Sequence, residues 1–131
     1  MKKIAAFFLA IIFIVCFSGC GIPFTAKKII DESEIYSERD IEKAMNAVYC
    51  EFTGFEGCVL LELEYDEEYS KERADDWAEN YGADEAIVLL SKFYVAAENG
   101  SLTPGKTYSK WNWILVRNNN GPWKLMTWGY G

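Results

Sequence analysis

Apolar residues recur every three or four positions between residues 38 and 52, which is the period of an amphipathic helix. Ser37 precedes this run as a suitable N-cap, and Asp40 follows three residues later, as in a variant capping box. The "TGFEG" segment then breaks the pattern. We therefore expect a helix from about Glu38 to Phe52, with this apolar stripe: Ile41, Met45, Val48 and Phe52.

The next two segments predict a strand and a short second helix. Residues 58–65 alternate with a period of two, which is typical of a half-buried strand. Ser70 is a candidate N-cap for the following helix, and Gly82 is a candidate stop signal. The side chains expected to face the core from the strand are Val59, Leu61, Leu63 and Tyr65. Those that share one helix face are Ala74, Trp77, Ala78 and Tyr81.

The rest of the chain is rich in β-forming residues. "EAIVLLSKFYVA", "TYSKWNWILVRN" and "PWKLMTWGY" predict three strands, and "NNNG" predicts a hairpin turn between the last two. The order of elements predicts an α+β fold, with one long helix packed on a curved antiparallel sheet of about four strands. Both faces of these strands carry apolar residues, so we expect a second cover, which is another subunit, a ligand or a bent part of the same sheet. A weak homodimer through the sheet follows from the first of these.

The N-terminus has the three zones of a secretory signal. Two lysines precede an apolar run of 14 residues, 4–17, which is shorter than the roughly 20 residues that cross a bilayer. The following "FSGC" resembles the lipobox of bacterial lipoproteins. The resemblance implies a signal peptide over residues 1–19, a lipid on Cys20, and an address at the outer face of the cell membrane, whereas Cys16 would be discarded. The alternative is an ordinary signal peptide with chance cysteines.

The mature chain divides into a tether and one domain. Residues 20–35 have no clear period and read as a tether, and residues 36–131 are of single-domain size. The formal net charge of the whole chain is −7, with most acidic residues between positions 36 and 85. Nucleic acid is not expected as a partner, because binding phosphates needs a basic surface.

Candidate chemistry is sparse. The chain contains no histidine, no serine-elbow motif and no Gly-rich phosphate loop, so we expect no metal, no cofactor and no nucleophilic catalysis. Cys50 and Cys58 remain after the signal, and outside the membrane they form either a disulfide or two thiols. The aromatic residues suggest a pocket at the open end of the fold, with one cation to orient an anionic group. Its residues would be Trp77, Tyr81, Trp111, Trp113, Arg117 and Trp128.

The second half of the chain, with "YGADEAIVLLSKFYV" and "YSKWNWILVRNNNGPWKLMTWGYG", is similar to small secreted lipoproteins of low-GC Gram-positive bacteria. The resemblance implies a cystatin-like or NTF2-like domain without an assigned activity, and it supplies no catalytic residues. The function that we expect is a non-enzymatic binding or interaction module. The alternatives are an NTF2-like enzyme acting on a small apolar ligand and a structural or inhibitory subunit of an envelope complex.

Overall fold

The computed structural model describes residues 25–130 of this 131-residue chain. They form two helices and five strands, so the expected α+β class is confirmed. The predicted signal peptide and Cys20 lie outside the described residues. Neither of the two described helices has the length and apolar character needed to span a bilayer. The elements are β1 (Lys27–Ile30), α2 (Glu38–Phe52), β2 (Cys58–Tyr65), α3 (Glu67–Tyr81), β3 (Glu85–Val95), β4 (Thr107–Arg117) and β5 (Lys124–Tyr130).

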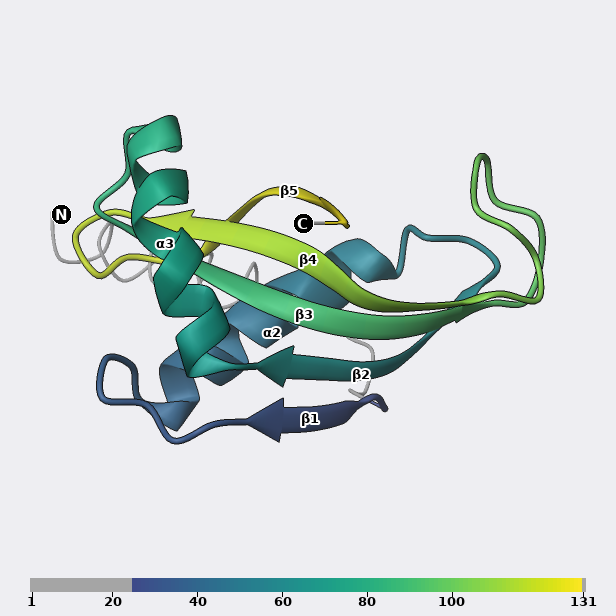
Figure 1. The fold of residues 1–131 in the computed structure, drawn as a ribbon, viewed down its shortest axis with the longest axis horizontal. Coiled ribbons are helices and arrows are strands. Elements are labelled where there is room, and N and C mark those ends of the chain that lie inside the picture. The colour runs from purple at the N-terminus through teal and green to yellow at the C-terminus, as the bar shows by residue number, and fades with distance from the viewer. Residues whose placement is uncertain (1–24, 131) are drawn as a thin grey trace, which may run out of the picture.

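The sheet is mixed and has the strand order β1-β2-β3-β4-β5 (Figure 1). The strands β2 to β5 are antiparallel, as expected, but β1 adds a parallel edge strand that the sequence analysis assigned to the tether. Lys27 pairs with Glu62 and Ile30 with Tyr65, and Lys28 forms a 3.2 Å ion pair with Glu42 of α2. Residues 27–30, expected as part of a tether, therefore complete the edge of the sheet.

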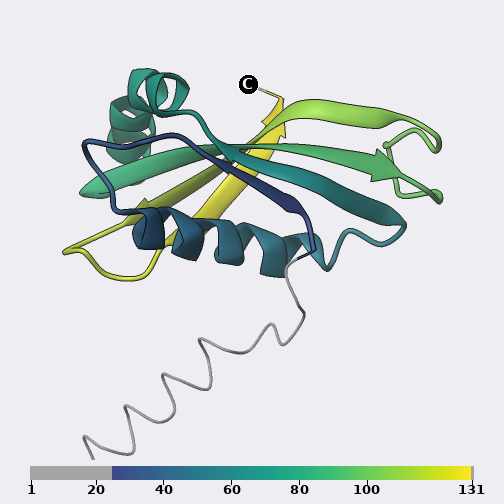
Figure 2. The same cartoon turned by 90° about the horizontal axis from the view of Figure 1, so that it is seen from below.

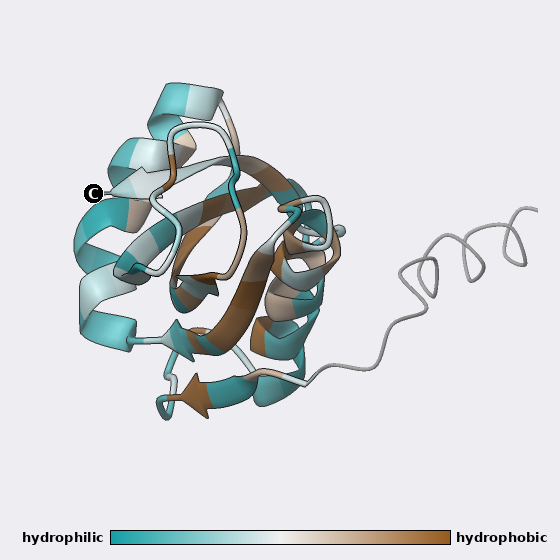
Figure 3. Cartoon of the chain, turned by 90° about the vertical axis from the view of Figure 1, so that its right-hand side faces the viewer, coloured by the Kyte–Doolittle hydropathy of each residue, from teal (hydrophilic) through white to brown (hydrophobic). Residues whose placement is uncertain are grey.

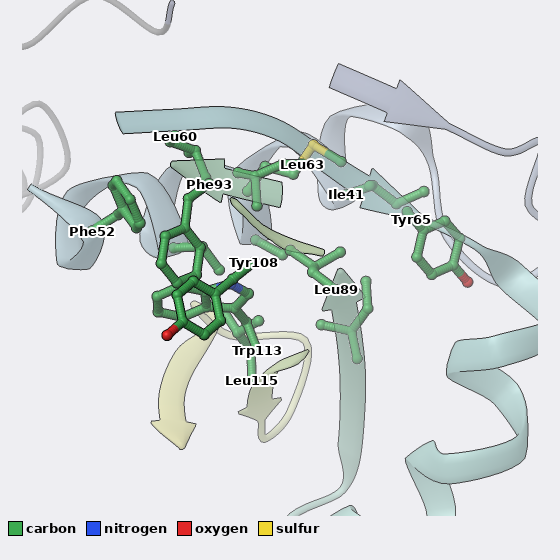
Figure 4. Packing of buried hydrophobic residues seen from close by; sticks show 14 of the residues in the cluster. Ile41, Phe52, Leu60, Leu63, Tyr65, Leu89, Phe93, Tyr108, Trp113 and Leu115 are labelled. Carbon is green, nitrogen blue, oxygen red and sulfur yellow. The ribbon is translucent and has the colours of Figure 1, made fainter. Parts of the chain in front are cut away.

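The helix α2 has the predicted bounds and the predicted buried stripe. The hydroxyl of Ser37 accepts a hydrogen bond from the backbone N–H of Asp40 at 3.1 Å, which caps the helix. The helix lies along one face of the twisted sheet (Figure 2). Apolar residues fill the space between them. Figure 3 shows the hydrophobic stretches of the strands in brown. Large side chains of this core include Phe52, Leu63, Tyr65, Phe93, Trp113 and Leu115 (Figure 4).

The helix α3 covers one end of the opposite face of the sheet (Figures 1 and 2). It has 15 residues, as many as α2, so the expectation of a short helix is wrong. Asp66 is the N-cap, whereas Ser70 is buried inside the helix and its hydroxyl accepts the Val88 N–H at 3.0 Å. Gly82 ends the helix in the left-handed conformation, with φ of 63°, as predicted. The second cover of the sheet is thus, at this end, a helix of the same chain.

The strand β2 contains a bulge between Leu60 and Glu62. A bulge inserts one extra residue and reverses which side chains point to each face. Leu60 is therefore buried, whereas Val59 and Leu61 are exposed, contrary to the simple alternation expected. Beyond the bulge, Leu63 and Tyr65 face the core as predicted. Both belong to the same buried cluster as Ile87, Leu89 and Phe93.

Candidate functional site

A groove of about 400 Å³ lies between the outer side of α2 and the loop that joins β4 to β5. A second concave site, of about 430 Å³, lies beside the segment between β1 and α2. The walls of the groove come from segments some 70 residues apart in sequence, so the tertiary fold alone creates it. Its lining residues are Asp40, Lys43, Asn46, Ala47, Cys50, Arg117, Asn120, Gly121, Pro122 and Trp123.

A tight turn fixes the loop wall of the groove. Asn119 and Asn120 have φ of 54° and 55°, and the Gly121 N–H donates to the Asn118 carbonyl at 2.9 Å, as in a type I′ turn. The turn is fastened to the segment after α3, because the Asp84 N–H donates to the Asn118 side chain at 2.8 Å. In return, the Asp84 carboxylate accepts the Asn119 N–H at 2.8 Å. The wall is therefore held from two sides.

Arg117 forms the floor of the groove and is only 7% exposed. Its Nε donates to Glu85 at 2.7 Å, and its NH1 group lies 3.3 Å from Asp40. Its guanidinium also lies 4.2 Å from the centre of the Trp123 ring, a cation–π distance. Burial lowers the pKa of Arg117, but the hydrogen bond and charge of Glu85, with the charge of Asp40, more than offset this and raise it. The arginine is therefore a permanent cation that joins α2, β3 and β4.

Trp123 and Tyr36 complete the support beneath the groove. The Trp123 indole N–H donates to the Asp40 carbonyl at 3.1 Å. The rings of Trp123 and Tyr36 meet edge to face, with 5.5 Å between their centres. The Tyr36 hydroxyl donates to the Ala86 carbonyl at 3.3 Å. Burial, followed by the negative charge of Glu85, raises the pKa of Tyr36 to about 12. At neutral pH this phenol is protonated and serves as a fixed hydrogen-bond donor.

The structure does not bring the six predicted pocket residues together. Trp77 and Tyr81 stack on each other at 5.9 Å on the α3 side of the sheet. Trp113 and Trp128 meet at 5.5 Å on the α2 side, where Trp111 also packs. The sheet separates the two groups, because α3 packs on the face opposite to α2. Of the six, only Arg117 lines the groove.

The space between α2 and the sheet is filled by core side chains. Trp113 is completely buried there, and its indole N–H donates to the Ser91 hydroxyl at 2.7 Å. Phe52 and Phe55 pack against the same indole at 6.3 Å and 5.5 Å between ring centres. Trp113 is therefore a core residue.

Cys50 and Cys58 do not form a disulfide. The bulge in β2 reverses the face to which Cys58 points, so that Cys58 packs against the core. Cys50 is exposed and lines the groove. Burial raises the pKa of the Cys58 thiol, and a 3.8 Å hydrogen bond from Asn99 opposes this in part. Within residues 25–130, no three His, Cys, Asp or Glu side chains gather in a way that could hold a metal ion.

Sequence reasoning missed most residues of the groove. Asp40 was assigned only to the helix cap. Lys43, Asn46 and Ala47 lie on the outer side of α2, whereas the sequence analysis considered only the apolar stripe of this helix. The Asn-rich turn was the one local signal, since it predicted a hairpin whose loop forms the second wall. Searches of protein-family models, curated proteins and solved structures give no match to this chain.

Proposed function

We propose that this protein is a non-enzymatic binding module, held by a lipid on Cys20 at the outer face of the cell membrane, and that it binds its ligand in the groove. The observation that carries the binding role is the preformed groove beside α2, with its floor fixed by Arg117 and its wall fixed by the 118–121 turn. A concave site with a few positioned polar groups is the usual form of a small-molecule site. Lipidation rests on the "FSGC" sequence.

The lining indicates the kind of molecule that would fit. Lys43, Asn46 and Asn120 are exposed at the rim and offer one cation and two amides. Ala47, Pro122 and Trp123 supply apolar surface between them. The proposed ligand is a small molecule that has an anionic or hydrogen-bonding end and an apolar part.

The packing of the interior favours a binding module over an NTF2-like enzyme that acts between the helix and the sheet. Such an enzyme needs a hollow between helix and sheet for its apolar ligand, and Trp113 and its aromatic neighbours occupy that space. Glu62 and Glu64, the carboxylates of β2, line a depression on the other face of the sheet. The Asp40 carboxylate is already paired with Arg117.

A subunit of an envelope complex is the second candidate. Trp128 and Tyr130 are 40% and 60% exposed on the edge strand β5, and large exposed aromatic side chains are common at protein interfaces. We further propose a cystatin-like or NTF2-like origin for the domain. The packing of one long helix across a curved, mainly antiparallel sheet supports this origin.

Membrane fractionation of two cysteine variants tests the anchor. Cys20→Ala is expected to leave the protein as precursor or to release it from membranes, because the thiol that accepts the lipid is lost. Cys16→Ala is the matched control and is expected to change neither. Lipid labelling that persists in Cys20→Ala would disprove the anchor.

Native mass spectrometry of the Cys20→Ala chain, purified under mild conditions, tests the groove. A co-purifying small molecule is expected, and Asn46→Trp is expected to abolish it because the indole fills the groove beside Ala47. Asn80→Trp, the same change at an exposed position of α3, is the control and should retain the molecule. Equal binding by both variants would exclude the groove as the site.

A further inference from the structure

The outer face of the sheet, on the side of α3, is only partly covered. The helix α3 packs over the end of the sheet near Ala86 and Val116 and leaves the opposite end of β2, β3 and β4 open (Figure 1). We name this uncovered area the open face and define it by Val59, Leu61, Lys92, Tyr94 and Lys110.

Three large apolar side chains of the open face are exposed to solvent. Val59 and Tyr94 are directly paired across β2 and β3, and they are 50% and 39% exposed. The bulge in β2 turns Leu61 outward as well, to 38% exposure. The three side chains therefore form a continuous patch, unlike single exposed residues, which are common on any protein.

Lysines border this apolar patch. Lys92 lies two positions before Tyr94, on the same face of β3, and is exposed. Lys110 stands at an irregularity of β4, with φ of 58°, and its side chain is 70% exposed while it pairs with Glu64 at 3.3 Å. Glu62 and Glu64 contribute negative charge nearby. Tyrosine and lysine side chains combine an apolar body with a polar tip, so both suit a boundary between water and an apolar phase.

The position of β1 places this surface beside the proposed anchor. Because β1 runs parallel to β2 and Lys27 pairs with Glu62, the chain enters the sheet next to the Leu61 bulge. Thr25 follows Cys20 by five positions, and five extended residues reach at most about 18 Å. A lipid on Cys20 would therefore hold this corner of the sheet close to the bilayer.

We propose that the open face docks on the lipid bilayer that holds the anchor, and this inference rests on the proposed lipid anchor. Lys92 and Lys110 would meet the headgroups, and Tyr94 and Leu61 would reach the interface below them. The groove lies on the other side of the sheet, beside α2, so docking would turn it away from the membrane.

Lysine acetylation of the lipidated mature protein tests this orientation. The protein is reconstituted in vesicles of phosphatidylcholine with phosphatidylglycerol, and labelling at each lysine is followed by mass spectrometry. Lys92 and Lys110 are expected to react severalfold more slowly on vesicles than in detergent. Lys43 of α2, which is exposed at the groove on the other side of the sheet, is the internal control and should not change.

A matched pair of variants links any protection to the apolar patch. Tyr94→Ser is expected to restore most of the labelling at Lys92, whereas Tyr130→Ser, the same change at an exposed position of β5, is expected to leave protection intact. Protection that depends on protein concentration in detergent would instead identify a second copy of the chain as the occupant. Unchanged labelling of a protein that floats with the vesicles would disprove docking and leave the anchor in place. A protein that does not float would disprove both.

Discussion

The hydroxyl of Tyr65, at the end of β2, donates a hydrogen bond of 3.0 Å to the carboxylate of Glu67, at the start of α3. The same carboxylate accepts hydrogen bonds from the Ser33 hydroxyl and, at 3.1 Å, from the Glu34 N–H. Asp31 joins them, because its carboxylate accepts the Glu67 N–H at 3.2 Å. One side chain thus fastens the segment between β1 and α2 to the junction of β2 and α3.

This arrangement predicts a loss of stability in acid. The hydrogen bonds from Ser33 and Glu34 lower the pKa of Glu67 below its ordinary value of about 4.3. A carboxyl group that binds its proton less tightly when folded stabilises the fold fully above its unfolded pKa, and this contribution is lost as the pH falls through the folded pKa. Glu67→Gln is expected to lower the urea midpoint at pH 7 and to reduce its decline toward pH 3.

Glu68→Gln is the control for this measurement, since Glu68 is an exposed neighbour in the same helical turn. It is expected to leave both the midpoint and its pH dependence close to those of the unchanged protein. If the two variants have the same pH profile, Glu67 does not hold the segment.

Replacing Arg117 by leucine is expected to destabilise the domain by about 2–3 kcal/mol, because Asp40 and Glu85 would lose their common partner. The cost stays below that of a fully buried pair, since the two carboxylate side chains keep 31% and 29% of their exposure. Arg117→Lys should recover part of the loss, because it keeps the charge but not the planar guanidinium. Thermal unfolding measures both, and equal stability of the two variants would contradict the role of charge.

Trp113→Leu is expected to cost about 2 kcal/mol or more, since it opens a cavity in the core and removes the hydrogen-bond donor to Ser91. Trp77→Leu should cost clearly less, because Trp77 is partly exposed at the edge of the smaller cluster under α3. Denaturant midpoints measured for both variants decide the order. A larger loss of stability for Trp77→Leu would contradict the assignment of the main core to the α2 side of the sheet.

Alanine substitutions at two glycines are expected to distinguish the cost of backbone strain from the cost of a steric contact. Gly82 and Gly57 both have positive φ, but a Cβ at Gly82 meets nothing within 4 Å, whereas one at Gly57 lies 2.9 Å from the Ala97 carbonyl oxygen. Gly82→Ala is therefore expected to cost about 1–2 kcal/mol from strain alone. Gly57→Ala should cost more, because the close approach between the start of β2 and the end of β3 must widen. Urea unfolding compares the two, and equal costs would show that the contact relaxes freely.

Local signals explain what the sequence could predict. The bounds of α2 follow from a stripe of period 3.6 and the Ser37 cap, and the stop at Gly82 and the turn at 118–121 depend on residues within a few positions of one another. Each of these features is encoded where it occurs.

The features that the sequence did not reveal depend on distant pairing. The strand β1 exists because residues 27–30 meet β2 more than thirty positions later, and a four-residue strand has no period of its own. The bulge at Leu61 is visible only against β3, yet it decides which side Val59 and Cys58 face. The groove has the same origin, because its two walls meet only after α2 and the β4–β5 hairpin have packed on one sheet.

The parallel edge strand also determines how the domain responds to a mechanical load. A pull on the chain before Thr25 acts first on the ladder between Lys27–Ile30 and β2. A force along the strand shears all of these hydrogen bonds together, whereas a force across it opens them one after another. The segment fastened by Glu67 carries the load next, and only then does it reach α2 and the core. Under a pull on the N-terminus, the four residues of β1 and the contacts of Glu67 are therefore expected to detach before α2 and the core unfold.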